Sequence, residues 1–366
     1  MTKRAFLIGL LLVAIVAALT PFNDYLFENT YFTGNHFPPG PFFLLLLLTL
    51  VVNILVKFVH PRAAFRQAEL MLIWCMLLVS STVPASGLMR YWLPTMAAPA
   101  YYANSPDLPS QDIVLEATPE ALVVSKNPHS IAAKQFFEGG RKGEKTRIYL
   151  GRWARPIAVW LIFIGFYYLA TFFVGGMLRK QWVEVERLMF PLARVPLELT
   201  EGSGRKRLLP EMFHQAPFLV GLALTLAFAL IRVSPVFLGK EQGWLPEIPL
   251  QNILANTPLD AVAWVSATLY PLAVGIAFLV PADVTLSVWL FFWVIHSEIL
   301  VSTWIGKPLK GGFFGEFMRW QQAGAFFSFV PMFLWAARRH LATVIKKAFG
   351  RGRDIDDSAE PIPYAL

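Results

Sequence analysis

The chain has 366 residues, of which 56% are hydrophobic and only 15% are charged, and its formal net charge at pH 7 is +8. A soluble domain carries about 25% charged residues, so this composition argues against a water-soluble globular protein. The basic residues stand in short groups beside apolar runs, which excludes the contiguous basic face of a nucleic-acid-binding protein.

Eight apolar runs are each about 20 residues long, which is the length that a helix needs to cross a bilayer. They cover residues 5–22, 42–59, 69–88, 153–178, 216–238, 261–280, 284–305 and 318–337. We therefore predict an all-α membrane protein of about eight transmembrane helices. Counts of seven or nine stay open, because the third run and the runs broken by proline could re-enter the membrane without crossing it.

The first run follows Lys3 and Arg4 and is closed by Pro21. Its basic start and its small residues Ala17 and Ala18 also fit a signal peptide that is cleaved. Because more apolar runs follow, we expect this run to be kept as a transmembrane helix.

Residues 89–152 differ from the runs on either side of them. They contain six prolines, and residues 104–151 hold six acidic and six basic residues. Prolines and mixed charges at this density are typical of segments outside the bilayer. We predict a long extramembrane loop, partly folded over the mouth of the protein.

Residues 182–200, between the fourth and fifth runs, form a predicted amphipathic segment at the cytoplasmic face. Its apolar residues recur at helical spacing, at Val185, Leu188, Met189, Leu192, Val195 and Leu199. Pro191 and Pro196 are expected to kink or end this helix. Two interpretations stay open: an interfacial connector, or a re-entrant element that lines a path and has Glu184 and Glu186 at its entrance.

Lysine and arginine in short loops mark the cytoplasmic side of a membrane protein. The start of the chain, residues 57–68, residues 179–215 and the segment after residue 338 are basic, which predicts that both termini lie in the cytoplasm. Residues 306–319 conflict with this topology, because they would lie outside but contain three basic residues.

Two parts of the chain are distinguished by composition. We interpret residues 1–340 as one polytopic transmembrane domain. Residues 341–366 form a polar tail that we expect to be disordered from residue 350 and that could be a point of truncation.

Ionisable residues inside apolar runs are candidate functional residues, because charge is costly in lipid. Asp283 lies between two runs that a proline separates; it could sit at a broken helix that holds a substrate, or it could cap the seventh run. Glu298, within that run, is a candidate proton carrier, as is Asp283, or else the ion-pair partner of an arginine. His296 lies two positions away and would point in a different direction on a helix.

Arg232, near the end of the fifth run, is the arginine that could pair with Glu298. It could instead extend to the interface or bind the carboxylate of a substrate. Glu69, at the start of the third run, fits the structural role of a negative charge at a helix N-terminus.

The chain has a single cysteine, Cys75, which we expect to be a small buried side chain. Its six histidines are scattered, and no Cys and His spacing is typical of a metal site. Nucleophile-elbow, phosphate-loop and dinucleotide motifs are also missing from the sequence. We therefore expect no cofactor, and no enzyme is indicated.

Several segments share a pattern with a known family. They are Arg179–Leu192 with Pro196–Glu198, Asn35–Pro41, Glu69–Met71 with Trp74, and Pro281–Phe292. As a set they resemble an uncharacterised family of large bacterial membrane proteins that is distantly similar to oligopeptide transporters. The resemblance covers most of residues 20–340 and implies, by analogy of fold, proton-coupled uptake of peptides or metal chelates at the cytoplasmic (inner) membrane. Members of that family are longer, so it also implies a missing C-terminal half.

We predict a transporter-like protein that moves a small polar solute, lies in a lipid bilayer, binds no nucleic acid and pairs with a missing half or a second copy. One alternative is a membrane enzyme acting on lipid or polysaccharide, which would gather acids, bases or metal ligands in residues 89–152. The other is a scaffold, in which Arg232, Asp283 and Glu298 would face headgroups or simple ion-pair partners. A transporter would gather its ionisable groups near the midplane.

Overall fold

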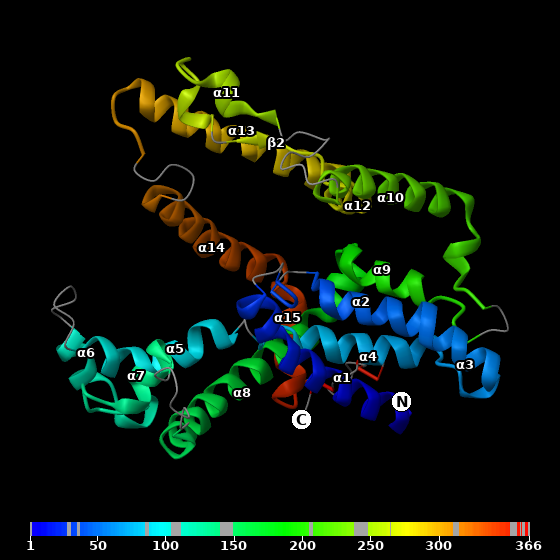
Figure 1. The fold of residues 1–366 in the computed structure, drawn as a ribbon, viewed down its shortest axis with the longest axis horizontal. Helices are drawn as coiled ribbons and strands as arrows, with labels where there is room; N and C mark the ends of the chain where they lie inside the picture. Colours follow the sequence, from blue (N-terminus) through cyan, green and yellow to red (C-terminus); the bar gives the residue numbers. More distant parts are fainter. Residues whose placement is uncertain are drawn as a thin grey trace. The chain divides into compact units, whose positions relative to one another are not determined.

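The computed structural model is helical over most of its length. It describes the chain except residues 1, 28–30, 35–36, 85–87, 104–110, 140–148, 205–207, 238–247, 264, 310–314, 352–356, 359, 361–362 and 365–366. The chain divides into two compact units, one of residues 1–174 and 196–211 and the other of residues 175–195 and 212–366. Figure 1 labels the α-helices, which are numbered in chain order, and the strand β2.

Five of the described helices are long and apolar enough to cross a membrane. They cover Lys3–Leu26, Pro39–Val59, Leu150–Val185, Ala216–Ser234 and Ala282–Trp304. Large apolar side chains such as Leu161, Leu224 and Leu290 are exposed along them, which is the arrangement expected where lipid surrounds a helix. The structure confirms a helical chain with several candidate membrane spans.

The predicted count of eight spans is not confirmed, because three runs give helices outside these five. The third run becomes α4 (Gln67–Ser80), which is about 21 Å long at 1.5 Å per residue, shorter than a hydrocarbon core of about 30 Å. Among the described residues of the sixth run, the one α-helix is α12 (Pro271–Leu279), so the prediction of one helix over residues 261–280 is wrong. The eighth run becomes α14 (Glu316–Ala336).

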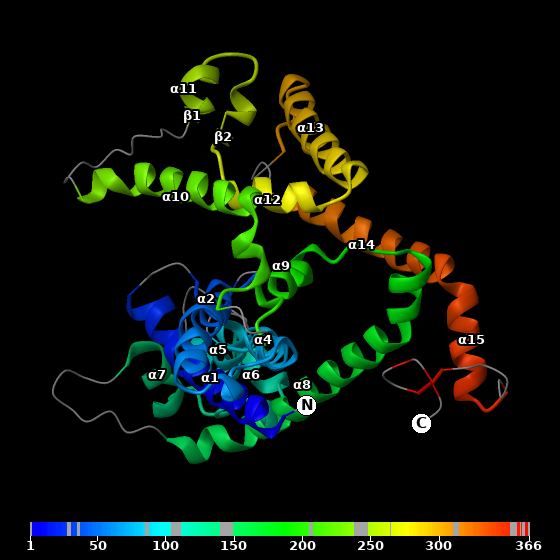
Figure 2. The same cartoon turned by 90° about the vertical axis from the view of Figure 1, so that its right-hand side faces the viewer.

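Three apolar helices pack together in the first unit. The helix α1 (Lys3–Pro21) continues into a π-helical turn, η1 (Phe22–Leu26), so Pro21 lies inside the helix and does not end it as predicted. Next, α2 (Pro39–Leu47), η2 (Leu48–Val52) and α3 (Asn53–Val59) form one continuous helix. The helix α4 contacts both α1 and α2 (Figures 1 and 2).

The described residues of 88–103 and 111–138 form a small helical group, which we call the α5–α7 bundle, where the sequence predicted a loop. It contains α5 (Leu88–Tyr102), α6 (Gln111–Ala117), the 3₁₀ turn η4 (Glu120–Leu122) and α7 (Ile131–Glu138). Its buried core is formed by Trp92, Met96, Ala97, Ala100, Leu115, Val124, Ala132 and Ala133. The Val124 N–H donates to the Met96 carbonyl over 3.0 Å, which ties the segment after α6 to α5. The loop prediction therefore missed a packed core.

The chain passes from α8 (Leu150–Lys180) into the second unit. Its elements there are η5 (Gln181–Val185), η6 (Glu211–His214), α10 (Ala216–Phe237), β1 (Ile248–Pro249), α11 (Leu250–Leu254), η7 (Asp260–Val262), β2 (Ser266–Ala267), α12, α13 (Ala282–Trp304), α14 and α15 (Arg338–Ala348). The two short strands pair antiparallel, with Ile248 opposite Ala267. The turn η7 contacts α13, and α14 leads into α15 (Figure 1).

The predicted amphipathic segment at residues 182–200 is two elements and not one helix. The π-helical turn η5 ends at Val185, and α9 (Pro191–Thr200) begins at Pro191, where the missing proline N–H costs no helical hydrogen bond. Between them Arg187 has a φ of 49°, in the left-handed region, which interrupts the helical run.

Ion pairs hold the described part of the tail, where the sequence predicted disorder. The Lys347 ammonium lies 2.9 Å from the Asp357 carboxylate, and the Arg179 guanidinium lies 3.2 Å from the Glu360 carboxylate. The Tyr364 N–H donates to Asp357 over 2.9 Å. At these residues the acidic tail thus has cationic partners on α8 and α15, which the sequence did not predict.

Candidate functional site

The helix α13 carries three of the predicted site residues. Asp283 lies exposed in its first turn, two residues after the N-cap residue Pro281. Its backbone carbonyl accepts a hydrogen bond from the Ser287 hydroxyl over 2.7 Å. This position fits the capping interpretation of Asp283, because a carboxylate is favourable near a helix N-terminus.

His296 is buried, with 3% of its surface exposed. Its Nδ1 lies 2.6 Å from the Phe292 carbonyl oxygen, and its ring centroid lies 4.1 Å from that of Phe292. The side chain is thus held against the preceding turn of its own helix.

Glu298 is half-buried on α13 and meets the next long helix. Both of its carboxylate oxygens accept hydrogen bonds from the Gln321 Nε2 of α14 over 3.1 Å. The carboxylate–amide contact joins α13 to α14 by polar groups inside two predominantly apolar helices. His296 and Glu298 therefore have different partners, as expected from their spacing on a helix.

The remaining predicted residues lie elsewhere in the second unit. The Arg232 guanidinium, near the end of α10, lies 5.6 Å from the Tyr270 ring centroid, within the range of a cation–π interaction. Glu184 is exposed in η5, and Glu186 follows that turn and accepts a hydrogen bond from the Gln181 amide over 3.0 Å. Arg232 thus contacts Tyr270 and Glu186 contacts Gln181, whereas Glu298 contacts Gln321.

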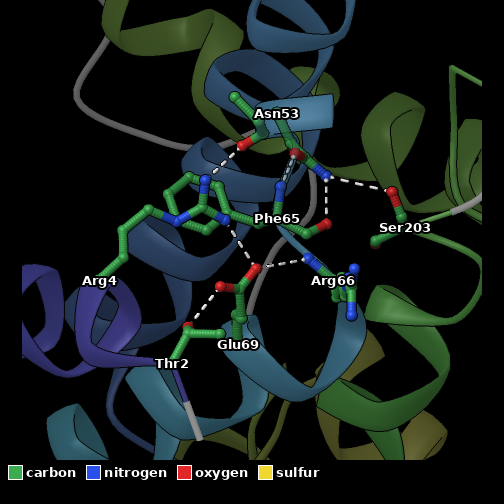
Figure 3. A network of polar contacts seen from close by, with 8 residues as sticks. Thr2, Arg4, Asn53, Phe65, Arg66, Glu69 and Ser203 are labelled. Atoms are coloured by element: carbon green, nitrogen blue, oxygen red, sulfur yellow. Dashed lines mark hydrogen bonds and ion pairs between the residues drawn. The ribbon is translucent and has the colours of Figure 1, made fainter. Parts of the chain in front are cut away.

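A second polar site lies in the first unit, where α1 meets α4 (Figure 3). The Glu69 carboxylate lies 2.7 Å from the Arg4 guanidinium and also accepts hydrogen bonds from the Thr2 hydroxyl and, over 3.0 Å, from the Arg66 N–H. Arg4 donates in addition to the Ala63 carbonyl over 2.6 Å. We call Thr2, Arg4, Arg66 and Glu69 the Glu69 cluster.

The Asn53 side chain extends this network to a third segment (Figure 3). Its Oδ1 accepts from the Phe65 N–H over 2.7 Å, and its Nδ2 donates to the carbonyls of Phe65 and Ser203 over 3.3 and 3.4 Å. The Arg4 guanidinium lies 4.6 Å from the Phe65 ring centroid. Phe65 therefore contacts both Arg4 of the Glu69 cluster and the Asn53 side chain.

Hydrogen bonds and a neighbouring charge set the protonation state of Glu69. This residue lies on α4, which is outside the five candidate spans. Burial raises the pKa of its carboxyl, but the hydrogen bonds from Thr2, Arg66 and Arg4, together with the Arg4 charge, outweigh this effect and hold the pKa below its usual value. Glu69 is thus an ionised side chain that fixes the start of α4 to the start of α1. The predicted role at a helix N-terminus agrees with this geometry, whereas its pairing with Arg4 was not predicted.

Cavities adjoin two polar sites among the described residues of the first unit. One, of about 490 Å³, adjoins the Glu69 cluster and is lined by Thr2, Arg66, Ala68, Glu69, Met71, Leu72 and Cys75. Cys75 is exposed there, so the prediction that it is buried is wrong. The other, of about 510 Å³, lies in the α5–α7 bundle. Among the described residues, no group of three or more His, Cys, Asp or Glu side chains could hold a metal ion.

Comparison with known proteins gives one match. The model of a family of unknown function (DUF6785) matches residues 1–366. No curated protein and no solved structure matches the chain. The predicted likeness to an uncharacterised family is confirmed, whereas the link to oligopeptide transporters and the bacterial origin stay predictions.

Proposed function

The chain belongs to the family of unknown function DUF6785, and we propose that it is a transporter-like membrane protein that moves a small polar solute, such as a peptide or a metal chelate, together with protons. We place it in the cytoplasmic membrane of a bacterium with both termini inside, as the basic loops favour. The observation that carries the proposal is the contact between Glu298 of α13 and Gln321 of α14.

The position of Glu298 along α13 supports a role in the membrane. It precedes the last helical residue, Trp304, by six positions, which is about 9 Å at 1.5 Å per residue. A carboxylate at this depth in an apolar span is costly in lipid and is a candidate functional group by default.

Gln321 is a suitable partner for a carboxyl group that gains and loses a proton. Its amide nitrogen can donate to the ionised carboxylate, and its amide oxygen can accept from the protonated acid. The contact between α13 and α14 can therefore persist in both protonation states. Asp283, exposed in the first turn of the same helix, is the less suitable carrier.

The finer topology is part of the proposal. Adding α4, the segment around α12 and α14 to the five candidate spans gives about eight membrane segments, some of which would re-enter. A second copy of the chain, or further spans of a longer polypeptide, would complete a pathway around Glu298.

The test uses the full chain, reconstituted into liposomes that contain a pH-sensitive dye. Alanylalanine and ferric citrate serve as the peptide and chelate probes. We expect one of them to drive proton entry, and Glu298→Gln to slow this entry at least about tenfold, because the amide cannot carry a proton. Glu316→Gln is the matched control, since it neutralises an exposed carboxylate on α14.

Two results would count against the proposal. Absence of proton entry with both probes would show that the protein does not move peptides or metal chelates together with protons. Equal rates for Glu298→Gln and the wild type would show that the carboxylate carries no proton, even if solute moves.

A further inference from the structure

The cavity in the α5–α7 bundle has no part in the proposed transport through α13 and α14. Its volume of about 510 Å³ lies within the range of about 300–1,000 Å³ that is typical of small-molecule sites. It is lined by Tyr101 and Tyr102 at the end of α5, by Pro128, His129 and Ser130 before α7, and by Lys134 and Glu138 on α7. Aromatic and polar side chains therefore meet in one concave site.

Helical spacing brings one wall of this cavity together. Ser130, Lys134 and Glu138 are four residues apart, so they lie on the same face of α7. The turn before the helix places His129, whose N–H donates to the Asn127 Oδ1 over 2.9 Å. The wall thus presents the Lys134 ammonium and the Glu138 carboxylate one helical turn apart.

Glu138 connects the polar groups of the two walls. Its carboxylate lies 3.8 Å from the Lys134 ammonium and accepts a hydrogen bond from the Tyr101 hydroxyl over 3.3 Å. Burial and the neighbouring Glu138 charge raise the pKa of Tyr101, so its phenol keeps the proton that it donates. The donors and acceptors are therefore already oriented without a ligand.

Ring packing fixes the aromatic wall. The Tyr101 ring stacks on the Phe137 ring, with centroids 4.6 Å apart, and the Tyr102 ring stands at 83° to that of Tyr101. The Ser130 hydroxyl is buried behind this wall and has no hydrogen-bond partner among the described residues, so Lys134, Glu138 and the two tyrosines are the groups left to contact a ligand.

The charges in the cavity limit the class of ligand. An anion such as a phosphate would meet the Glu138 carboxylate, and a quaternary ammonium ion would meet the Lys134 ammonium. A neutral molecule with many hydroxyl groups avoids both conflicts, since each hydroxyl can accept from Lys134 and donate to Glu138. The C–H face of a sugar ring also suits the negative face of a tyrosine ring.

We propose that this cavity binds a neutral saccharide of one or two rings, with Tyr101 and Tyr102 against the ring face and Lys134 and Glu138 on the hydroxyl groups. The sugar could be free or could be the headgroup of a glycolipid, because both present the same chemistry. This binding site is separate from Glu298, so it does not depend on the proposed function.

The test is isothermal titration calorimetry of the full chain in phosphatidylcholine nanodiscs. The protein must be purified in a detergent without a sugar headgroup, because such a detergent would occupy the site. Glucose and maltose are the neutral probes, and glucose 6-phosphate and choline are the charged ones. We expect a neutral probe to bind, with a Kd below about 10 mM, and the charged probes to bind at least about tenfold more weakly.

Variants locate the binding in the cavity. We expect Glu138→Gln and Lys134→Ala each to raise the Kd about tenfold, since each loses a hydrogen bond to a charged group. Glu120→Gln in the same bundle and Lys346→Ala on α15 are the matched controls, because both residues are exposed and lie outside the cavity. Unchanged melting temperatures would show that all four variants are folded.

A second arm identifies the source of the sugar. If a lipid headgroup is the occupant, nanodiscs that contain glucosyl diacylglycerol will bind maltose more weakly than those of phosphatidylcholine alone, whereas a site for free sugar will not change. The proposal is overturned if neither neutral probe binds, if a charged probe binds more tightly, or if the cavity variants match their controls.

Discussion

At the scale of the single residue, the Asn53 side chain holds segments of the first unit together. It is 1% exposed and makes hydrogen bonds to Phe65 and Ser203. Asn53→Ala removes these hydrogen bonds and leaves the Phe65 N–H without the acceptor that it has in the wild type. We expect it to lower the free energy of unfolding by about 1–3 kcal/mol, measured as a fall in the melting temperature of the purified protein in detergent micelles.

Asn252→Ala is the control for this prediction, because Asn252 is exposed on α11. Its effect should stay within about 0.5 kcal/mol. Equal melting temperatures of the two variants would mean that the Asn53 contacts do not stabilise the fold.

Residues with partners far along the chain could not be found from the sequence. Asn53 bonds to carbonyls 12 and 150 positions away, and Glu69 pairs with Arg4 across 65 positions. A polar residue in an apolar run indicates that a partner is needed, but not which one. Glu298 was a predicted site residue because its charge stands out in α13, whereas its partner Gln321 was not.

At the scale of the element, apolar length predicted the long helices well. The predicted runs at residues 216–238 and 284–305 differ from α10 and α13 by two residues or fewer at each end. Proline was the less reliable signal, since the π-helical turn after Pro21 carries the helix on to Leu26. The α5–α7 bundle was missed because its core joins short helices whose contacts no local pattern reveals.

The tail next to α15 provides a prediction of pH dependence. Hydrogen bonds from Lys347 and from the Tyr364 N–H lower the pKa of Asp357. The contact thus adds stability above the usual aspartate pKa of about 3.9, and this stability is lost as the pH falls through the lowered pKa of the folded state. We expect the docked tail to resist pepsin at mildly acidic pH and to be released only below that pKa, as followed by mass spectrometry of the fragments.

Asp357→Asn serves as the reference at each pH, because its side-chain amide stays neutral. Comparing the cleavage rates of the variant and the wild type at the same pH removes the effect of pH on pepsin itself. The wild type should be cut more slowly than this variant above the lowered pKa and at the same rate below it. Identical cleavage at every pH would show that the Asp357 charge does not hold the tail.

At the scale of the whole molecule, the long helices expose apolar side chains, an arrangement that is favourable in lipid and costly in water. Leu224 lies near the middle of α10 and is 67% exposed. In water, exchange of such a residue for arginine would be nearly neutral, but at the centre of a span it costs about 3 kcal/mol of insertion free energy. We therefore expect Leu224→Arg to reduce the protein recovered in carbonate-washed membranes.

Leu259→Arg is the matched control, because Leu259 is also exposed but lies outside the five candidate spans. It should leave recovery in the washed membranes unchanged. The two variants separate lipid from water as the solvent of α10, since an exposed leucine in water would tolerate arginine at either position. Equal recovery of both, or wild-type protein that stays in the supernatant after ultracentrifugation without detergent, would contradict a membrane-spanning α10 and, with it, the significance of Glu298.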